Sequence, residues 1–135
     1  MKIASLFLFL HLGLAACHAQ PQSWPTTKSW KVYASSGPEV FKVPVDSLPA
    51  IPSKLLDRDT VQFYLSKMQI VPDDRKPTWM GAWLASYESA DGKLRKVEIG
   101  AYGGYFYDVS SEKYYSLPRN LILRWQRFIS ANIPE

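Results

Sequence analysis

Residues 79–102 read WMGAWLASYESADGKLRKVEIGAY, and this segment has the clearest β-sheet pattern in the chain. Two runs rich in aromatic, aliphatic and β-branched residues, 79–88 and 94–102, flank the turn sequence ADGK at 90–93. Asp-Gly is favoured in tight hairpin turns because both residues tolerate positive φ. The stretch therefore predicts two antiparallel strands joined by a short turn.

The first of these strands is apolar on both faces. Successive side chains of a strand point to opposite sides, so one face would carry Trp79, Trp83 and Tyr87, and the other Met80, Ala82 and Leu84. Both faces then need cover. We expect either two helices on opposite faces of the sheet, or one face left for the N-terminal segment or a partner.

The sequence after residue 102 continues the sheet and then changes to a helical pattern. Gly103-Gly104 offers a reversal into a strand at 105–109, and a turn at 110–113 leads to Tyr114-Tyr115. Ser116 is a candidate N-cap and Pro118 a first-turn residue of a final helix. Its apolar residues recur on one stripe: Leu121, Ile122, Trp125, Phe128 and Ile129.

Upstream of the hairpin, one helix and a pair of short strands are expected. Helical spacing predicts a helix over residues 59–69, with Asp59 and Gln62 forming a capping box. The turn-rich cluster at 35–38 separates the apolar runs 30–33 and 40–45, which suggests a hairpin or two edge strands.

These patterns together predict an α+β fold. We expect an antiparallel β-meander of about four to six strands with two amphipathic helices packed on it. The chain has 135 residues, 47% hydrophobic and 21% charged, which excludes a disordered chain and allows a single domain, placed at 30–135. Acidic and basic residues are interspersed and the formal net charge is +4, so no nucleic-acid-binding stripe is expected.

The first seventeen residues have the pattern of an export and lipidation signal. Residues 1–16 begin with a basic residue, continue as an apolar run and end on Ala15-Ala16, as in a secretory signal peptide. The segment Leu14-Ala15-Ala16-Cys17 resembles the lipobox of bacterial lipoproteins. The resemblance implies diacylation of Cys17, which would then anchor the chain to a membrane. Residues 17–29 would form the lipidated end and a flexible tether.

Plain secretion is the alternative to lipidation. An ordinary signal peptidase could cut after Ala19 and release the protein as a secreted or periplasmic domain. In the lipoprotein family an Asp directly after the acylated cysteine favours retention in the inner membrane. His18 stands at that position, which favours the outer membrane.

Most catalytic chemistry is absent from the expected domain. The two histidines are His11 and His18, and the one cysteine is Cys17, so the domain has no His and no free Cys. Triads, His-based acid and base catalysis and His/Cys zinc sites are therefore excluded. We expect no metal and no cofactor, and we interpret the carboxylates as caps, turns and solvated loops. A pair acting on glycans is the exception that spacing leaves open.

Two groups of residues are candidates for binding. Tyr105 and Tyr107 share one face of their strand, and with Trp83 they would supply rings for a partner or a sugar, although most rings in so aromatic a domain belong to the core. Lys93, Arg95 and Lys96 bracket the hairpin turn and would meet an acidic partner or a lipid headgroup. Solvated turns often carry such charges without binding anything.

The sequence thus favours a small non-catalytic envelope lipoprotein that binds a protein partner, for example as an inhibitor, an immunity-type protein or an accessory subunit. The alternative is binding of glycan or peptidoglycan, or their cleavage by carboxylates. A purely structural lipoprotein is a third hypothesis. An aromatic patch on one surface would favour the first, and a cleft with two carboxylates the second.

Overall fold

The computed structural model describes residue 24 and residues 27–34, 37–78, 81–101 and 104–135. The expected signal at 1–16, Cys17, and Trp79 and Met80 of the expected strand lie outside the described residues. Within them, no helix has the length and apolar character needed to cross a membrane.

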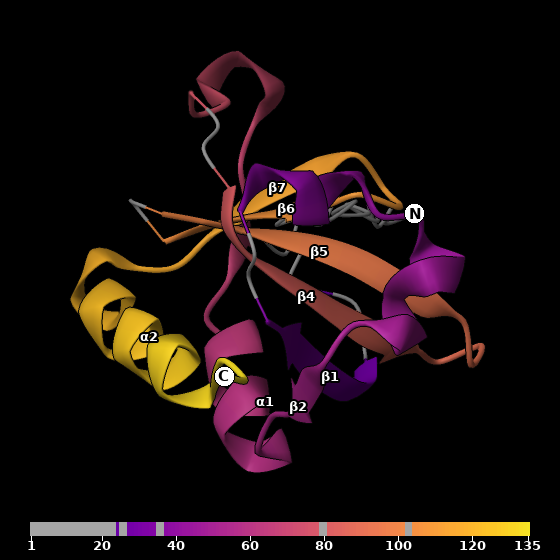
Figure 1. Ribbon diagram of the computed structural model, residues 1–135. Coiled ribbons are helices and arrows are strands. Elements are labelled where there is room, and N and C mark those ends of the chain that lie inside the picture. The colour runs from indigo at the N-terminus through magenta and orange to yellow at the C-terminus, as the bar shows by residue number, and fades with distance from the viewer. Residues whose placement is uncertain (1–23, 25–26, 35–36, 79–80, 102–103) are drawn as a thin grey trace, which may run out of the picture.

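A seven-stranded antiparallel sheet forms the centre of the molecule (Figure 1). Its order is β2-β1-β4-β5-β6-β7-β3. The strands are β1 (Thr27–Tyr33), β2 (Ser53–Leu55), β3 (Gln69–Ile70), β4 (Gly81–Ser89), β5 (Leu94–Gly100), β6 (Tyr105–Asp108) and β7 (Lys113–Ser116). The α+β prediction is confirmed, and β2 and β3, both very short edge strands, bring the strand count above the expected range.

The predicted hairpin lies in the middle of this sheet. Strands β4 and β5 pair antiparallel around the 90–93 turn, with Tyr87 opposite Arg95 and Ala85 opposite Val97. Gly92 has φ of 80° and Asp91 has no positive φ, so the connection is a three-residue loop with glycine in the left-handed conformation at its last position. Strand β1 pairs with the outer side of β4, and β6 with the outer side of β5.

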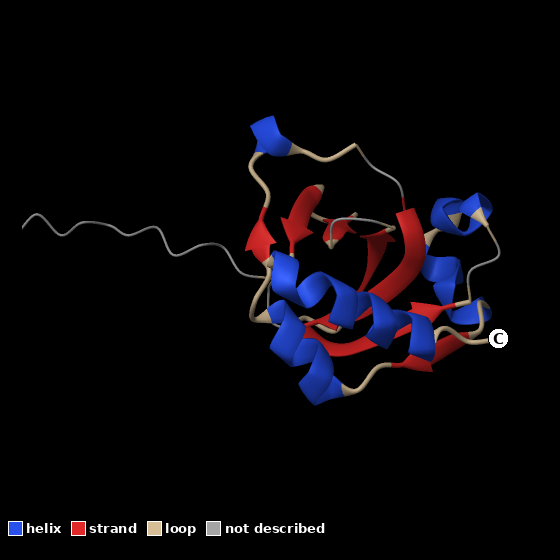
Figure 2. Cartoon of the chain, turned by 90° about the vertical axis from the view of Figure 1, so that its left-hand side faces the viewer, coloured by secondary structure: helices blue, strands red, loops and turns tan. Residues whose placement is uncertain are grey.

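Two helices, α1 (Arg58–Leu65) and α2 (Arg119–Asn132), cover one face of the sheet (Figures 1 and 2). Their buried side chains meet those of the strands in the main core, where Trp125 of α2 contacts Phe106 of β6 with ring centroids 5.2 Å apart. Trp24 also belongs to this core, and β1 begins at Thr27. The folded domain therefore starts before residue 30.

Two 3-10 helices from the N-terminal part of the chain pack on the opposite face. Helices η1 (Pro38–Lys42) and η2 (Val45–Ala50) place Val40 and Leu48 against Leu84 of β4. A third 3-10 helix, η3 (Asp73–Arg75), lies in the loop before β4. The two-faced apolar pattern of β4 is thus explained by cover from the N-terminal segment, the second of the two arrangements expected.

The prediction of strands at 40–45 was wrong, because this run forms η1, a link and the start of η2. Its alternating apolar residues face the sheet without joining it. Two polar contacts lie on this face of the sheet. The Tyr33 and Ser86 hydroxyls hydrogen-bond at 2.7 Å, and the Lys96 ammonium donates to the carbonyl of Val43, in the link between η1 and η2, at 3.1 Å.

Both helices also begin differently from the prediction. The N-cap of α1 is Asp57, whose carboxylate accepts the Thr60 amide at 2.9 Å and so replaces the expected Asp59–Gln62 box. The helix ends at Leu65 because residues 69–70 pair with β7. Helix α2 starts after Pro118 with no side-chain cap, since Ser116 is the last residue of β7.

Candidate functional site

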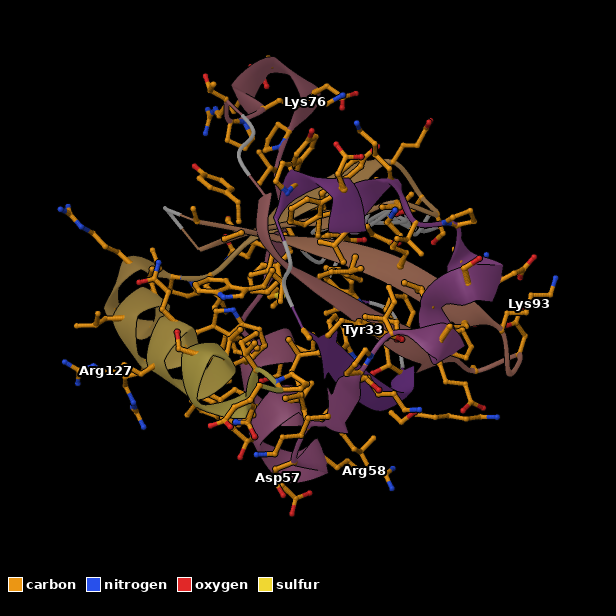
Figure 3. The ribbon with its side chains drawn as sticks, in the orientation of Figure 1. Tyr33, Asp57, Arg58, Lys76, Lys93 and Arg127 are labelled. Atoms are coloured by element: carbon orange, nitrogen blue, oxygen red, sulfur yellow. The ribbon has the colours of Figure 1, made fainter. Side chains whose placement is uncertain are left out.

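The basic residues expected at the hairpin do not form one patch. Lys93 is exposed at the tip, far from Lys76 and Arg127 (Figure 3). Arg95 is partly buried and lies 3.6 Å from the Asp91 carboxylate. Hydrogen bonds from Ser89 and from the Lys93 amide lower the pKa of Asp91, and nearby charges add to the effect. The turn is therefore largely satisfied by its own polar groups.

Lys96, predicted at the hairpin surface, is buried and bonds to backbone carbonyls. It is 7% exposed, and its ammonium donates to the carbonyls of Phe41 and Val43. A buried charge needs such partners because its desolvation is costly. Lys96 thus fastens the link between η1 and η2 to β5, and its ammonium is not presented at the hairpin surface.

Trp83 lies on the helix-covered face, apart from the two predicted tyrosines. It is partly buried and packs against the main core, as Trp125 does more completely. Tyr87 and Tyr115 belong to the same core. The aromatic residues therefore divide between the two faces of the sheet instead of forming one continuous row.

Tyr105 and Tyr107 lie on the other face, as their spacing predicts. Both are partly exposed, whereas Phe106 between them is buried in the main core. Strand pairing places Tyr107 between Glu98 of β5 and Tyr114 of β7. The rings of Tyr107 and Tyr114 have centroids 4.7 Å apart. We call Glu98, Tyr105, Tyr107 and Tyr114 the tyrosine face.

The charges of two glutamates act on the tyrosine face. The pKa of Tyr107 is raised, first by burial and then by the charge of Glu112, with further contributions from Tyr114 and Glu98. Negative charge near a phenol opposes its ionisation. The face therefore combines π-rings with carboxylates, a combination that attracts cations.

Asp108 is a buried carboxylate that accepts several hydrogen bonds within the fold. The Tyr87 hydroxyl donates to its Oδ2 at 3.0 Å, Ser111 donates to the same oxygen at 3.0 Å, and the Ser110 amide and hydroxyl donate to Oδ1 at 3.1 and 2.8 Å. Burial, and next the Asp108 charge, raise the pKa of Tyr87. With this many donors, Asp108 holds the turn between β6 and β7 in place.

A small apolar pocket opens where β1, the end of β2 and the start of α1 meet. It has a volume of about 160 Å³, comparable with cavities that hold a single aromatic ring. Trp30, Leu55, Leu56 and Val61 line it, with Lys28 and Arg58 also among its lining residues. Sequence reasoning missed this pocket because its walls come from three segments whose approach depends on the pairing of β1 with β2.

The described part of the chain contains no group of three or more His, Cys, Asp or Glu side chains placed to hold a metal ion. No protein-family model matches the chain, and comparisons with curated proteins and with solved structures likewise found no match.

Proposed function

We propose that this chain is a lipid-anchored protein of the bacterial cell envelope whose domain binds a protein partner through the tyrosine face. The observation that carries the proposal is the placement of three partly exposed tyrosines on one face of β6 and β7, outside the cluster that η1 and η2 form with β4. Tyrosines are enriched among residues that dominate binding energy, because they bury a large rigid ring and keep a polar tip.

The charge of the tyrosine face selects the kind of partner. Glu98 and Glu112 both act on Tyr107, so a partner that contacts this ring meets negative charge as well. A Lys or Arg side chain of the partner would gain from the carboxylates and from the face of a ring. We therefore propose a partner surface that presents basic residues.

Site-specific photo-cross-linking in cells tests the proposal. A benzophenone amino acid replaces Tyr105 or Tyr107 in the full-length protein, and the same substitution at exposed Lys31 serves as the control. We expect one discrete cross-linked protein from positions 105 and 107, and none from position 31. Glu98→Gln combined with Glu112→Gln should weaken its capture, and equal cross-linking from all three positions would refute the proposed surface.

Glycan binding or cleavage is the second candidate, and the same face supports it. Rings stack on sugars, and Glu98 and Glu112 are two carboxylates that act on one ring. Peptidoglycan fragments are the probe. If the full-length protein binds them with loss in Tyr107→Ser, and cross-linking finds no protein, glycan recognition replaces the first proposal. Release of new reducing ends that disappears in Glu98→Gln would establish cleavage.

The anchor is tested separately. Mass spectrometry of the protein purified from membranes should find a diacylated Cys17 as the N-terminal residue, and Cys17→Ser should abolish membrane retention. Cleavage after Ala19 would instead establish plain secretion. Outer-membrane placement, which His18 favours, is checked by separating the two membranes on a density gradient.

A further inference from the structure

We propose that the outer surface of the two α-helices rests on an anionic phospholipid bilayer. This helix surface consists of Phe63 and Lys67, at and just beyond the end of α1, and Leu123, Arg124 and Arg127 of α2. The inference rests on the lipid anchor proposed above and adds which side of the domain the membrane contacts.

Exposed apolar side chains are the first observation. Three large hydrophobic residues are exposed in the described chain, and two of them, Phe63 at 44% and Leu123 at 57%, project from these two helices. The Lys67 ammonium lies 5.9 Å from the centre of the Phe63 ring. A ring beside a cation is a pairing that suits the interface between headgroups and acyl chains.

Charge is the second observation. Helix α2 contains Arg119, Arg124 and Arg127, all exposed, and no acidic residue. The formal net charge of the whole chain is +4, so this helix alone carries most of the positive excess. Basic side chains held close to an anionic leaflet each add attraction that falls off within a Debye length.

Contacts between the helices place these groups on a common surface. Tyr64 of α1 contacts Trp125 and Phe128 of α2, with centroid distances of 4.9 and 6.2 Å. At 3.6 residues per turn, Phe63 and Lys67 flank Tyr64 on its solvent side, and Arg124 lies one turn before Phe128. The two helices lie side by side (Figure 2), and Arg127 points away from the sheet (Figure 3).

The tether limits how far the domain moves from the bilayer. Trp24, the first described residue of the core, lies seven positions after Cys17, and an extended chain of seven steps spans at most about 25 Å. A domain held so close contacts the bilayer often, and its most cationic and apolar surface gains most from the contact. The tyrosine face, on the other side of the sheet, then points away from the membrane toward partners.

Fluorescence quenching in vesicles tests the orientation. The full-length acylated protein is reconstituted into phosphatidylcholine vesicles with or without phosphatidylglycerol, and a fluorophore is attached to Phe63→Cys or Leu123→Cys. Labels at Lys31→Cys and Lys93→Cys, both exposed, are the controls. We expect spin-labelled lipids to quench the first two labels at least about twofold more than the controls, and only with phosphatidylglycerol present.

Charge reversal sharpens the test. Losing one basic contact weakens attraction to the bilayer about fivefold, so R124E/R127E should reduce quenching at position 63 to the level at position 93. The matched variant K31E/K93E makes the same change in net charge elsewhere and should leave quenching at 63 unchanged. Equal quenching at all four labels, or equal effects of both charge reversals, would overturn the proposal.

Failure of the anchor gives a different result. An acylated Cys17 has no free thiol, and cleavage after Ala19 removes Cys17, so neither form of the parent protein takes up the fluorophore and the N-terminal mass distinguishes the two. An N-terminus without diacylated Cys17, or uptake of the fluorophore by the parent, contradicts the anchor proposal. Salt-sensitive flotation of the parent with phosphatidylglycerol vesicles, lost in R124E/R127E, would still support the helix surface, whereas no flotation would overturn it.

Discussion

The two faces of the sheet use the same strands for opposite purposes. On the helix-covered face, Phe106 and Trp125 are almost completely enclosed. On the other face, Tyr107, one residue from Phe106, stays partly exposed beside Glu98. The difference comes from strand alternation, which points neighbouring residues to opposite sides, and from the α-helices that cover one of those sides. The comparison shows that one aromatic run builds a core and a candidate binding surface at once.

Removing one ring from each face should give the largest contrast. Trp125→Ala empties the centre of the helix-covered core and should lower the free energy of unfolding by about 3 to 5 kcal/mol. Tyr107→Ala removes a partly exposed ring paired with Tyr114 and should cost about 1 kcal/mol. Urea unfolding monitored by circular dichroism measures both. Comparable losses would show that the tyrosine face is part of the core.

Gly104 lies in close contact with Ile122 of α2. It has φ of 63°, and an added Cβ would lie 2.7 Å from Cγ1 of Ile122. Gly104→Ala should therefore destabilise by about 2 to 3 kcal/mol, from both backbone strain and overpacking. In an Ile122→Ala background the Cγ1 atom that the new Cβ would meet is absent. The loss of unfolding free energy caused by Gly104→Ala should then fall toward the contribution of backbone strain alone. Thermal unfolding of the four proteins checks this, and strictly additive effects would contradict the close approach.

Lys96 tests what stabilises the face of the sheet opposite the α-helices. Lys96→Met leaves the carbonyls of Phe41 and Val43 without their donor and should cost about 2 kcal/mol. Hydrogen exchange should accelerate over residues 38–50 and stay unchanged in α2. Lys93→Met, at the exposed tip, is the control and should change stability by less than about 0.5 kcal/mol. Uniform acceleration across the domain would mean that Lys96 stabilises the whole fold and not this segment.

The smallest expected effect concerns the charge of the tyrosine face. Burial and then Glu112 raise the pKa of Tyr107, so Glu112→Gln should lower this pKa toward its ordinary value. Asp73→Asn, in the loop before β4, removes a charge of the same sign as a control. Carbon-13 resonances of the tyrosine ring, followed from pH 8 to 12, report the shift. No change would show that Glu112 does not act on the face.

The sequence predicts the centre of this fold well because its signals there are local. The Asp91-Gly92 turn, the alternation in β4 to β6 and the apolar stripe of α2 each lie within one element. Residues 40–45 show where such reasoning fails: their alternation reads as a strand, but Pro44 and the contact of Val40 and Leu48 with β4 favour 3-10 turns. That preference depends on a tertiary contact with residues some 40 positions away.

The candidate site follows the same division. Alternation within one strand is enough to place Tyr105 and Tyr107 together, and both were predicted. Tyr114, Glu98 and Glu112 were not selected, because their approach to Tyr107 follows from the register of β5, β6 and β7. Lys96 illustrates the converse, since a lysine beside a turn reads as exposed until the segment that buries it is placed.

The sheet also ends abruptly on both sides, and this shapes how copies of the protein coexist. Its outermost strands, β2 and β3, have three and two residues, and Pro52 and Lys54 stand at the first edge. Edges so short, interrupted and charged offer little template for pairing with another sheet. A lipid anchor would concentrate such molecules in two dimensions, where encounters between edges are frequent. If the protein is anchored, the short edge strands would therefore oppose fibril formation between crowded copies on the membrane.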